Sequence, residues 1–107
     1  MEEDDVKARY STACELWEKV APSFLTKVDK LTSANYVHDL ASIIGFSRST
    51  VNYLSDSSNP ISQKLSTFIL DLQQMRGGNV VVNKELLKNS INEISAMFDQ
   101  ERENMGR

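Results

Sequence analysis

The side chains of this chain that are best suited to specific recognition are gathered in residues 47–54, SRSTVNYL. Arg48 can donate two hydrogen bonds to a guanine, and Asn52 can form a bidentate pair with an adenine. Hydroxyl groups can contact either bases or phosphates. We expect the hydroxyl groups of Ser49 and Tyr53 to face outward and that of Ser47 to lie at the start of a helix. The side chains of this stretch are therefore suited to hydrogen bonding with double-stranded DNA.

Catalytic and metal-binding chemistry finds little support in the sequence. His38 is the sole histidine and Cys14 the sole cysteine, so neither a zinc cluster nor a nucleophile with its base can be assembled. The segment RGGN (76–79) has two glycines but lacks the lysine of a phosphate-binding loop. We therefore expect a protein that is not an enzyme and that uses no cofactor and no metal.

The elements that would position these side chains are helices. Apolar residues recur at spacings of three and four almost throughout, which predicts an all-α, compact helical domain. The first helical pattern is interrupted at Pro22, where we expect a break, because proline is disfavoured inside a helix. A new helix is expected after TSAN (32–35), with Ser33 or Asn35 as its N-cap.

Gly45 is expected to end this second helix. Two helices that cross steeply through a short turn need one residue in a left-handed conformation, which glycine adopts most easily. Ala41 would allow close approach, Phe46 would fill the inside of the corner, and Ser47 would cap a new helix over 47–55. The outward face of that helix would carry the polar residues named above.

Residues 37–56 resemble the helix-turn-helix of phage repressors and Cro-type regulators, and the likeness can extend to residue 76. The matching residues are Leu40, Ala41, Ile44, Gly45, Phe46, Val51 and Leu54. Val37 stands where members of that family often have a glutamine. The resemblance implies that DNA is contacted by Ser47, Arg48, Ser49, Asn52 and Tyr53.

The end of the chain carries an apolar seam. Gly77–Gly78 should close another helix, which follows Pro60, and Val80–Val82 is a short strand-like run. Asn83 is a plausible N-cap for a last helix over 83–103. Its seam has coiled-coil spacing and can pack either on its own domain or on a second copy. The seam residues are Leu87, Ile91, Ile94 and Phe98.

Charge and composition leave the choice of partner open. The net charge is −3, and the run of acidic residues at 2–5 accounts for more than all of it, so the remainder is close to neutral. No apolar run is long enough to cross a membrane, and a single cysteine fits a reducing compartment, so a cytoplasmic location is expected. We expect a disordered acidic tail over 1–5, a helical domain over 6–78, and an oligomerisation element over 79–107.

Two hypotheses follow. The first is a DNA-binding transcriptional regulator, a homodimer that places helix 47–55 in the major groove of two half-sites roughly 34 Å apart. Phosphates would be held by Lys27, Lys30 or Lys64, and the seam of the last helix would join the subunits. The second is a helical protein-interaction module or assembly subunit that binds no nucleic acid. The sequence specifies no operator, no effector and no direction of regulation.

Overall fold

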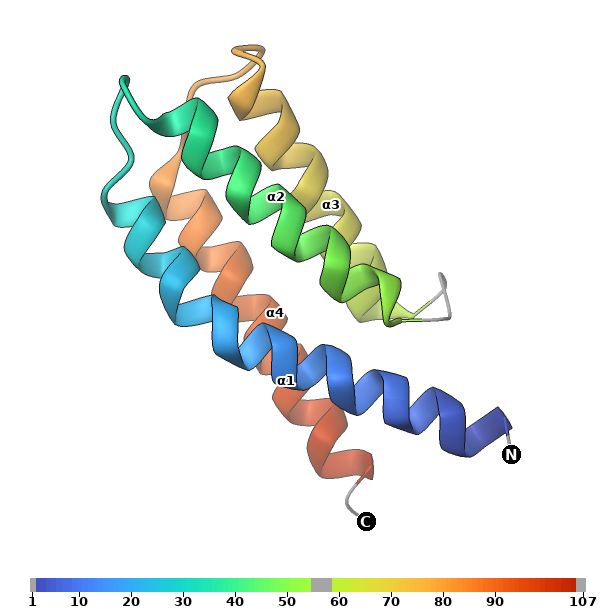
Figure 1. Ribbon diagram of the computed structural model, residues 1–107. Helices are drawn as coiled ribbons and strands as arrows, with labels where there is room; N and C mark the ends of the chain where they lie inside the picture. The colour runs from blue at the N-terminus through green and yellow to red at the C-terminus, as the bar shows by residue number, and fades with distance from the viewer. Residues whose placement is uncertain (1, 55–58, 106–107) are drawn as a thin grey trace.

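The computed structural model describes residues 2–54 and 59–105, and these residues form four helices. They are α1 (Glu2–Asp29), α2 (Tyr36–Asn52), α3 (Pro60–Arg76) and α4 (Lys84–Met105). Successive helices run in opposite directions, and α4 returns alongside α1 (Figure 1). Each helix packs on its two neighbours in the order α1, α2, α3, α4, which makes an up-and-down four-helix bundle. The all-α prediction is confirmed.

The core is built around Trp17, which is almost fully buried. Its ring meets Phe24 of α1, Phe68 of α3 and Phe98 of α4, with ring centroids 5.6 to 6.3 Å apart. The indole N–H donates to Ser95 Oγ at 2.8 Å, so the polar atom of this large side chain is satisfied in the interior. Three of the four helices therefore converge on one aromatic cluster.

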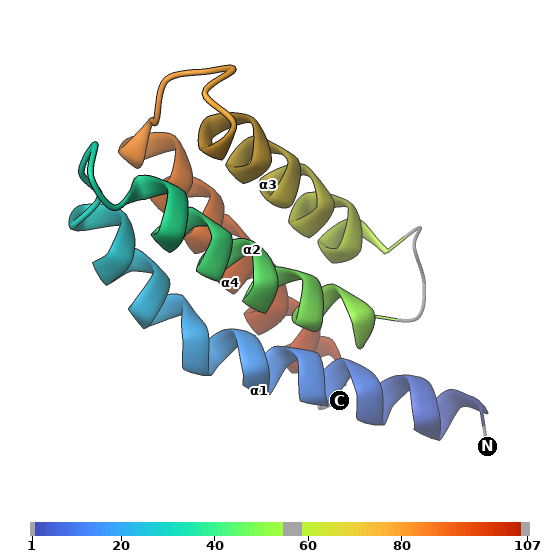
Figure 2. The ribbon, with the colours of Figure 1, turned by 45° about the horizontal axis from the view of Figure 1, so that its top comes forward.

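α1 continues through Pro22, where a break was expected. The residues on both sides of the proline belong to one buried stripe, since Trp17, Phe24 and Val28 all face the core. Packing of this stripe outweighs the loss of one backbone hydrogen bond at Pro22. The ribbon of α1 bends along its length in both views, as the absence of that N–H favours (Figures 1 and 2).

α2 is a single helix through Gly45, so the expected corner at this glycine is wrong. Gly45 is exposed and lacks the positive φ that the turn required; among the described residues only Gly78 has one. Ser47 and Thr50 are buried and extend the stripe of Leu40, Ile43 and Ile44 across the expected break. These small side chains let the stripe continue at helical spacing.

The hydroxyl groups of Ser49 and Thr50 bond within α2. Ser49 Oγ donates to the carbonyl of Gly45 at 3.2 Å, and Thr50 Oγ1 donates to that of Phe46 at 3.1 Å. Ser47 caps nothing, because it lies inside the helix. The predictions that Gly45 ends one helix and that Ser47 caps the next are therefore wrong. Val51 and Leu54 do face the core, as expected.

Several expected helix boundaries are confirmed. Asn35 occupies the N-cap position of α2, although its side chain bonds to the preceding loop and not to the helix. Asn83 Oδ1 accepts from the amide of Leu86 at 3.0 Å at the start of α4. Gly77 is the C-cap of α3, and Gly78 follows with φ 80°. These signals are local, so neighbouring helices do not alter them.

The expected division into three parts is corrected. Residues 2–5 are the first turn of α1 and do not form a separate tail, whereas Met1 lies outside the described residues. Residues 79–105 are not a separate element, because α4 packs on α1 and α3, and residues 106–107 lie outside the described residues. Residues 80–82 form no strand, and the side chain of Val81 is 88% exposed.

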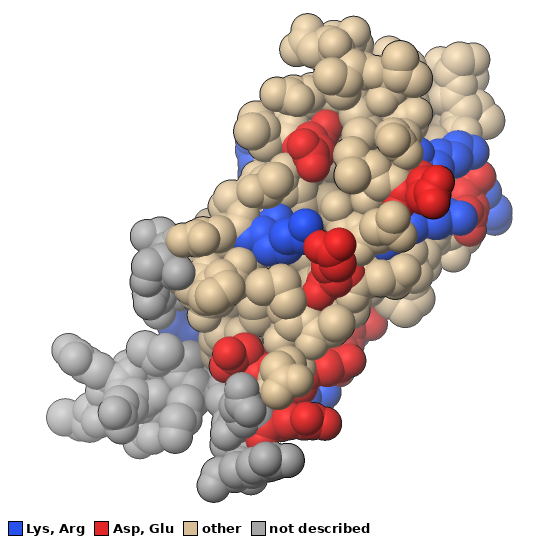
Figure 3. All heavy atoms as spheres, turned by 180° about the vertical axis from the view of Figure 1, so that it is seen from behind, with Lys and Arg blue, Asp and Glu red and all other residues tan. Residues whose placement is uncertain are grey.

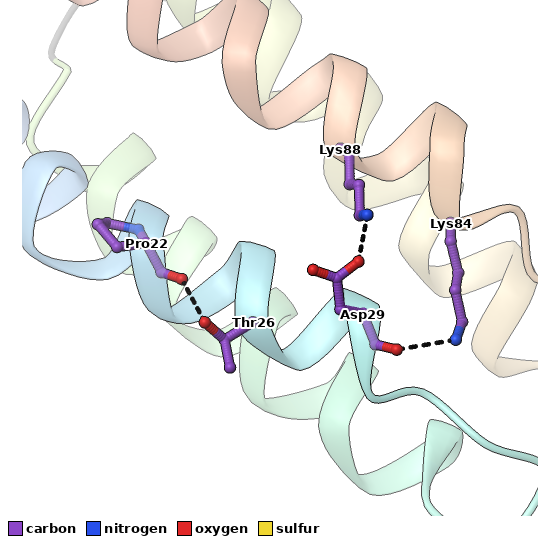
Figure 4. Close-up of polar contacts among 5 residues, drawn as sticks. All are labelled: Pro22, Thr26, Asp29, Lys84 and Lys88. Carbon is purple, nitrogen blue, oxygen red and sulfur yellow. Dashed lines mark hydrogen bonds and ion pairs between the residues drawn. The ribbon is translucent and has the colours of Figure 1, made fainter.

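Ion pairs and a lysine hydrogen bond connect α4 to α1 and α3. Lys88 pairs with Asp29 at the end of α1, and Lys84 Nζ donates to the carbonyl of Asp29 at 3.0 Å (Figure 4). Figure 4 also shows the Thr26 hydroxyl donating to the carbonyl of Pro22 at 3.1 Å. The remaining pairs are Arg102 with Glu18 and, at 2.7 Å, Lys64 with Glu93.

Candidate interaction surface

The second half of α2 presents most of the residues that the sequence singled out for recognition. Arg48, Ser49, Asn52 and Tyr53 are exposed, as expected. Ser47 is fully buried, so the prediction that it contacts DNA is wrong. Its position on the inner face of a continuous helix is the reason.

The lysines expected to bind phosphate lie elsewhere. The carbonyl of Lys30 accepts from Asn35 Nδ2 at 3.1 Å, so Lys27 and Lys30 lie near the start of α2. Arg48 is roughly 20 Å further along the helix, at 1.5 Å per residue. Lys64 pairs with Glu93 between α3 and α4. The residues predicted to contact DNA bases and the lysines predicted to bind phosphate therefore do not form one surface.

The electrostatics of this half of α2 also differ from those expected. A recognition helix beginning at Ser47 would direct the positive end of its dipole at a phosphate. In the continuous helix, residues 48–53 lie at the C-terminal end, where the partial charge is negative. Figure 3 shows the face opposite to the view of Figure 1, where Lys and Arg are interspersed with Asp and Glu on a largely uncharged surface.

A groove lies between α1 and this half of α2. Its volume is about 580 Å³, and it is lined by Arg9, Leu16, Phe46, Ser49, Asn52 and Tyr53. Phe46 is 51% exposed and Tyr53 is 40% exposed, so two aromatic rings border the groove at the surface. Phe46 was expected to fill the inside of a corner; instead it lies at the surface, 6.3 Å from the ring of Phe24.

The groove has two different ends, because α1 and α2 run in opposite directions. Arg9 Nη2 donates to the carbonyl of Asn52 at 3.4 Å, which places the cation at the C-terminal end of α2. Leu16 is two helical turns further along α1 and lies with Phe46 at the other end. One end is therefore cationic and polar, and the other is apolar.

The seam expected to join two subunits is part of the chain's own core. Leu87, Ile91, Ile94 and Phe98 are at most 1% exposed. They face α1 and α3, because α4 fills the fourth place of the bundle. The seam is thus unavailable to a second copy, and its prediction as a dimer interface is corrected. The other possibility left open by the sequence, packing on its own domain, is the one observed.

Two buried titratable groups have raised pKa values. Burial, together with the negative charge of Glu101, raises the pKa of Tyr10 to about 12. Burial and the neighbouring Glu18 raise the pKa of the Cys14 thiol, which favours its neutral form. His38 is exposed. Across residues 2–54 and 59–105 no three His, Cys, Asp or Glu side chains come close enough to hold a metal ion.

Arg9 and Leu16 are the groove residues that the sequence did not single out. They are seven residues apart on α1 and flank its buried stripe, so they share a face. This spacing indicates that both residues lie near the core. It does not indicate which helix packs beside them. The groove exists only because the second half of α2 packs against α1.

The fold and this surface define a class: a small four-helix bundle with a surface groove and, within the described helices, none long and apolar enough to span a membrane. No family model, curated protein or solved structure matches the chain.

Proposed function

We propose that this protein is a cytoplasmic protein-interaction module that acts by binding, through the groove between α1 and α2, and not by catalysis. The observation that supports this most directly is the exposure of Phe46 and Tyr53 along an open groove. Exposed aromatic side chains beside a cation are typical of protein-binding sites, where Tyr, Phe and Arg are enriched.

Site-specific photo-crosslinking tests this proposal. A benzophenone amino acid at Ser49, beside the groove, should form an adduct with a partner protein in cells that produce the chain. The same group at Asn92, an exposed position on α4, is the matched control. The adduct at Ser49 should disappear when Phe46 is replaced by serine, and the identified partner, once purified, should bind the wild-type chain.

Equal adducts at both positions, or none at Ser49, would contradict the proposal. Phe46→Ser should leave the fold intact, because the side chain is half exposed. Far-ultraviolet circular dichroism of each variant checks this point.

DNA binding remains a second candidate, supported by one observation: Arg48, Ser49, Asn52 and Tyr53 are all exposed on one half of α2. It can no longer rely on a turn at Gly45 or on the seam of α4. Homodimerisation likewise stays a prediction and requires another surface.

Fluorescence anisotropy with mixed-sequence duplex DNA tests the second candidate. A DNA-binding protein should bind at about 50 mM salt and weaken steeply by about 200 mM, because counterions are released from phosphates. Arg48→Ala should then weaken binding, and it should loosen base specificity if the arginine reads a guanine. No binding at the lower salt concentration would remove this candidate.

A further inference from the structure

The length of the α1–α2 groove matches two turns of a helix. On α1 its lining residues are seven apart, and on α2 Phe46, Ser49 and Tyr53 follow at i, i+3 and i+7. Seven residues of helix span about 10 Å. A helix of another protein that lies in such a groove contacts it through residues at i, i+3 or i+4, and i+7. The groove therefore accommodates one face of a short helix.

The polarity of the groove determines how that helix would lie. Leu16 and Phe46 provide apolar contact at one end, and Arg9 provides a positive charge at the other. None of the described lining residues is acidic. A carboxylate on the bound helix would complement Arg9 if it followed the apolar residues toward that end.

Arg9 is the only charged residue among the described residues that line the groove. Charge complementarity thus favours a ligand with a single carboxylate at the Arg9 end.

On the basis of the proposed function, we propose that the ligand is a short amphipathic helix of a partner protein. Its apolar face lies on Leu16, Phe46 and Tyr53, and one Asp or Glu pairs with Arg9. This inference adds the chemical class and the direction of the ligand to the proposed function. A nucleic acid fits the groove less well, since phosphates would meet an apolar surface and the negative end of α2.

Peptide display provides the test. A library of random 16-residue peptides is selected against the full chain, and the enriched peptides are synthesised and measured by isothermal titration calorimetry. They should share apolar residues at helical spacing and one Asp or Glu beside that stripe. Phe46→Ser should weaken their binding at least tenfold, whereas Leu70→Ser, an exposed position on α3, should leave it unchanged.

The role of Arg9 is tested by charge reversal. Arg9→Glu should weaken the selected peptides, and the same peptides with Lys in place of the acid should then bind the variant better than the wild-type chain. Because exposed ion pairs are weak, we expect changes of about two- to fivefold. Retained affinity after this reversal would overturn the inference.

The outcomes separate the two proposals. Peptides that need Phe46 but ignore the charge at residue 9 would overturn the inference and leave the proposed function standing. Failure to enrich any peptide, or enrichment of peptides that bind equally well without Phe46, would contradict both. Displacement of bound peptide by mixed-sequence duplex DNA, reversed by salt, would assign the groove to nucleic acid and also overturn the inference.

Discussion

At the scale of single residues, the partly buried Ser95 and the fully buried Ser47 have opposite surroundings. Ser95 accepts the indole hydrogen bond of Trp17 at 2.8 Å. Ser47 is fully buried, and its hydroxyl has no hydrogen-bond partner among the described residues. The same hydroxyl group is therefore satisfied at one position and left with a desolvation cost at the other.

Replacement of each serine by alanine should reveal this difference. Ser47→Ala should leave the free energy of unfolding unchanged or raise it by up to about 1 kcal/mol, because an unsatisfied polar group is removed and alanine favours helix. Ser95→Ala should lower it by about 1–3 kcal/mol, because the buried indole N–H loses its acceptor. Urea denaturation measures both. A marked loss of stability in Ser47→Ala would show that its hydroxyl has a partner.

Tyr10 links stability to alkaline pH. Its pKa is about 12 in the folded chain against about 10 when unfolded, so the folded state keeps a proton that the unfolded state releases. The resulting stability is fully present below pH 10 and is lost as the pH rises toward 12.

Tyr10→Phe should remove this pH dependence. Between pH 10 and 12 the wild-type chain should lose about 1–2 kcal/mol more of its unfolding free energy than the variant, as measured by denaturation at each pH. Tyr53→Phe, which removes the hydroxyl of an exposed ring, is the control for loss of a tyrosine hydroxyl as such. Parallel curves for wild type and Tyr10→Phe would contradict the argument.

At the scale of elements, Gly45 and Gly78 present the same residue type in opposite conformations. Gly45 lies inside α2, and a Cβ added there would meet nothing within 4 Å. Gly78 has φ 80°, a conformation that side chains with a Cβ rarely adopt. Glycine is thus unfavourable at the first position and required at the second.

Alanine at each position distinguishes a continuous α2 from a helical corner. Gly45→Ala should raise the free energy of unfolding by about 0.5–1 kcal/mol, because alanine restricts the unfolded chain and fits the helix. Gly78→Ala should lower it by about 1 kcal/mol or more. Thermal and urea unfolding measure both changes. Destabilisation by Gly45→Ala would restore the corner that the sequence predicted.

These positions show where sequence reasoning succeeded. The all-α class, the cap at Asn83 and the end of α3 at Gly77 follow from local rules that neighbouring helices leave intact. Pro22 and Gly45 were misread, because packing of long buried stripes overrides local breakers. Local propensity indicates where a helix can end, and the stripe determines whether it does.

The candidate site was predicted only in part. Ser49, Asn52 and Tyr53 could be identified from α2 alone, because exposure follows from helical spacing. Arg9 contributes through its contact with the carbonyl of Asn52, 43 residues away, which no single-helix pattern contains. Likewise, the seam of α4 had two possible partners, and only the tertiary structure shows that α1 and α3 cover it.

At the scale of the whole molecule, α4 completes the bundle and closes the ring of helix contacts. It covers the open side between α1 and α3, and Phe98 joins the aromatic cluster at Trp17. Ion pairs at Glu18 and Asp29 hold it along α1. Without α4 the inner faces of two helices would be exposed to water.

Removal of residues 79–107 should therefore abolish cooperative unfolding, and not simply convert a dimer into a monomer. The remaining chain would expose Trp17 and Phe68, and 78 residues without their fourth helix bury too little apolar surface to offset chain entropy. Circular dichroism during thermal unfolding checks this, with full-length Leu86→Ala as the control, because Leu86 is 42% exposed on α4 and its loss should cost less than about 0.5 kcal/mol. If the shortened chain kept a sharp transition and behaved as a monomer beside a dimeric full-length protein, α4 would be an oligomerisation element after all.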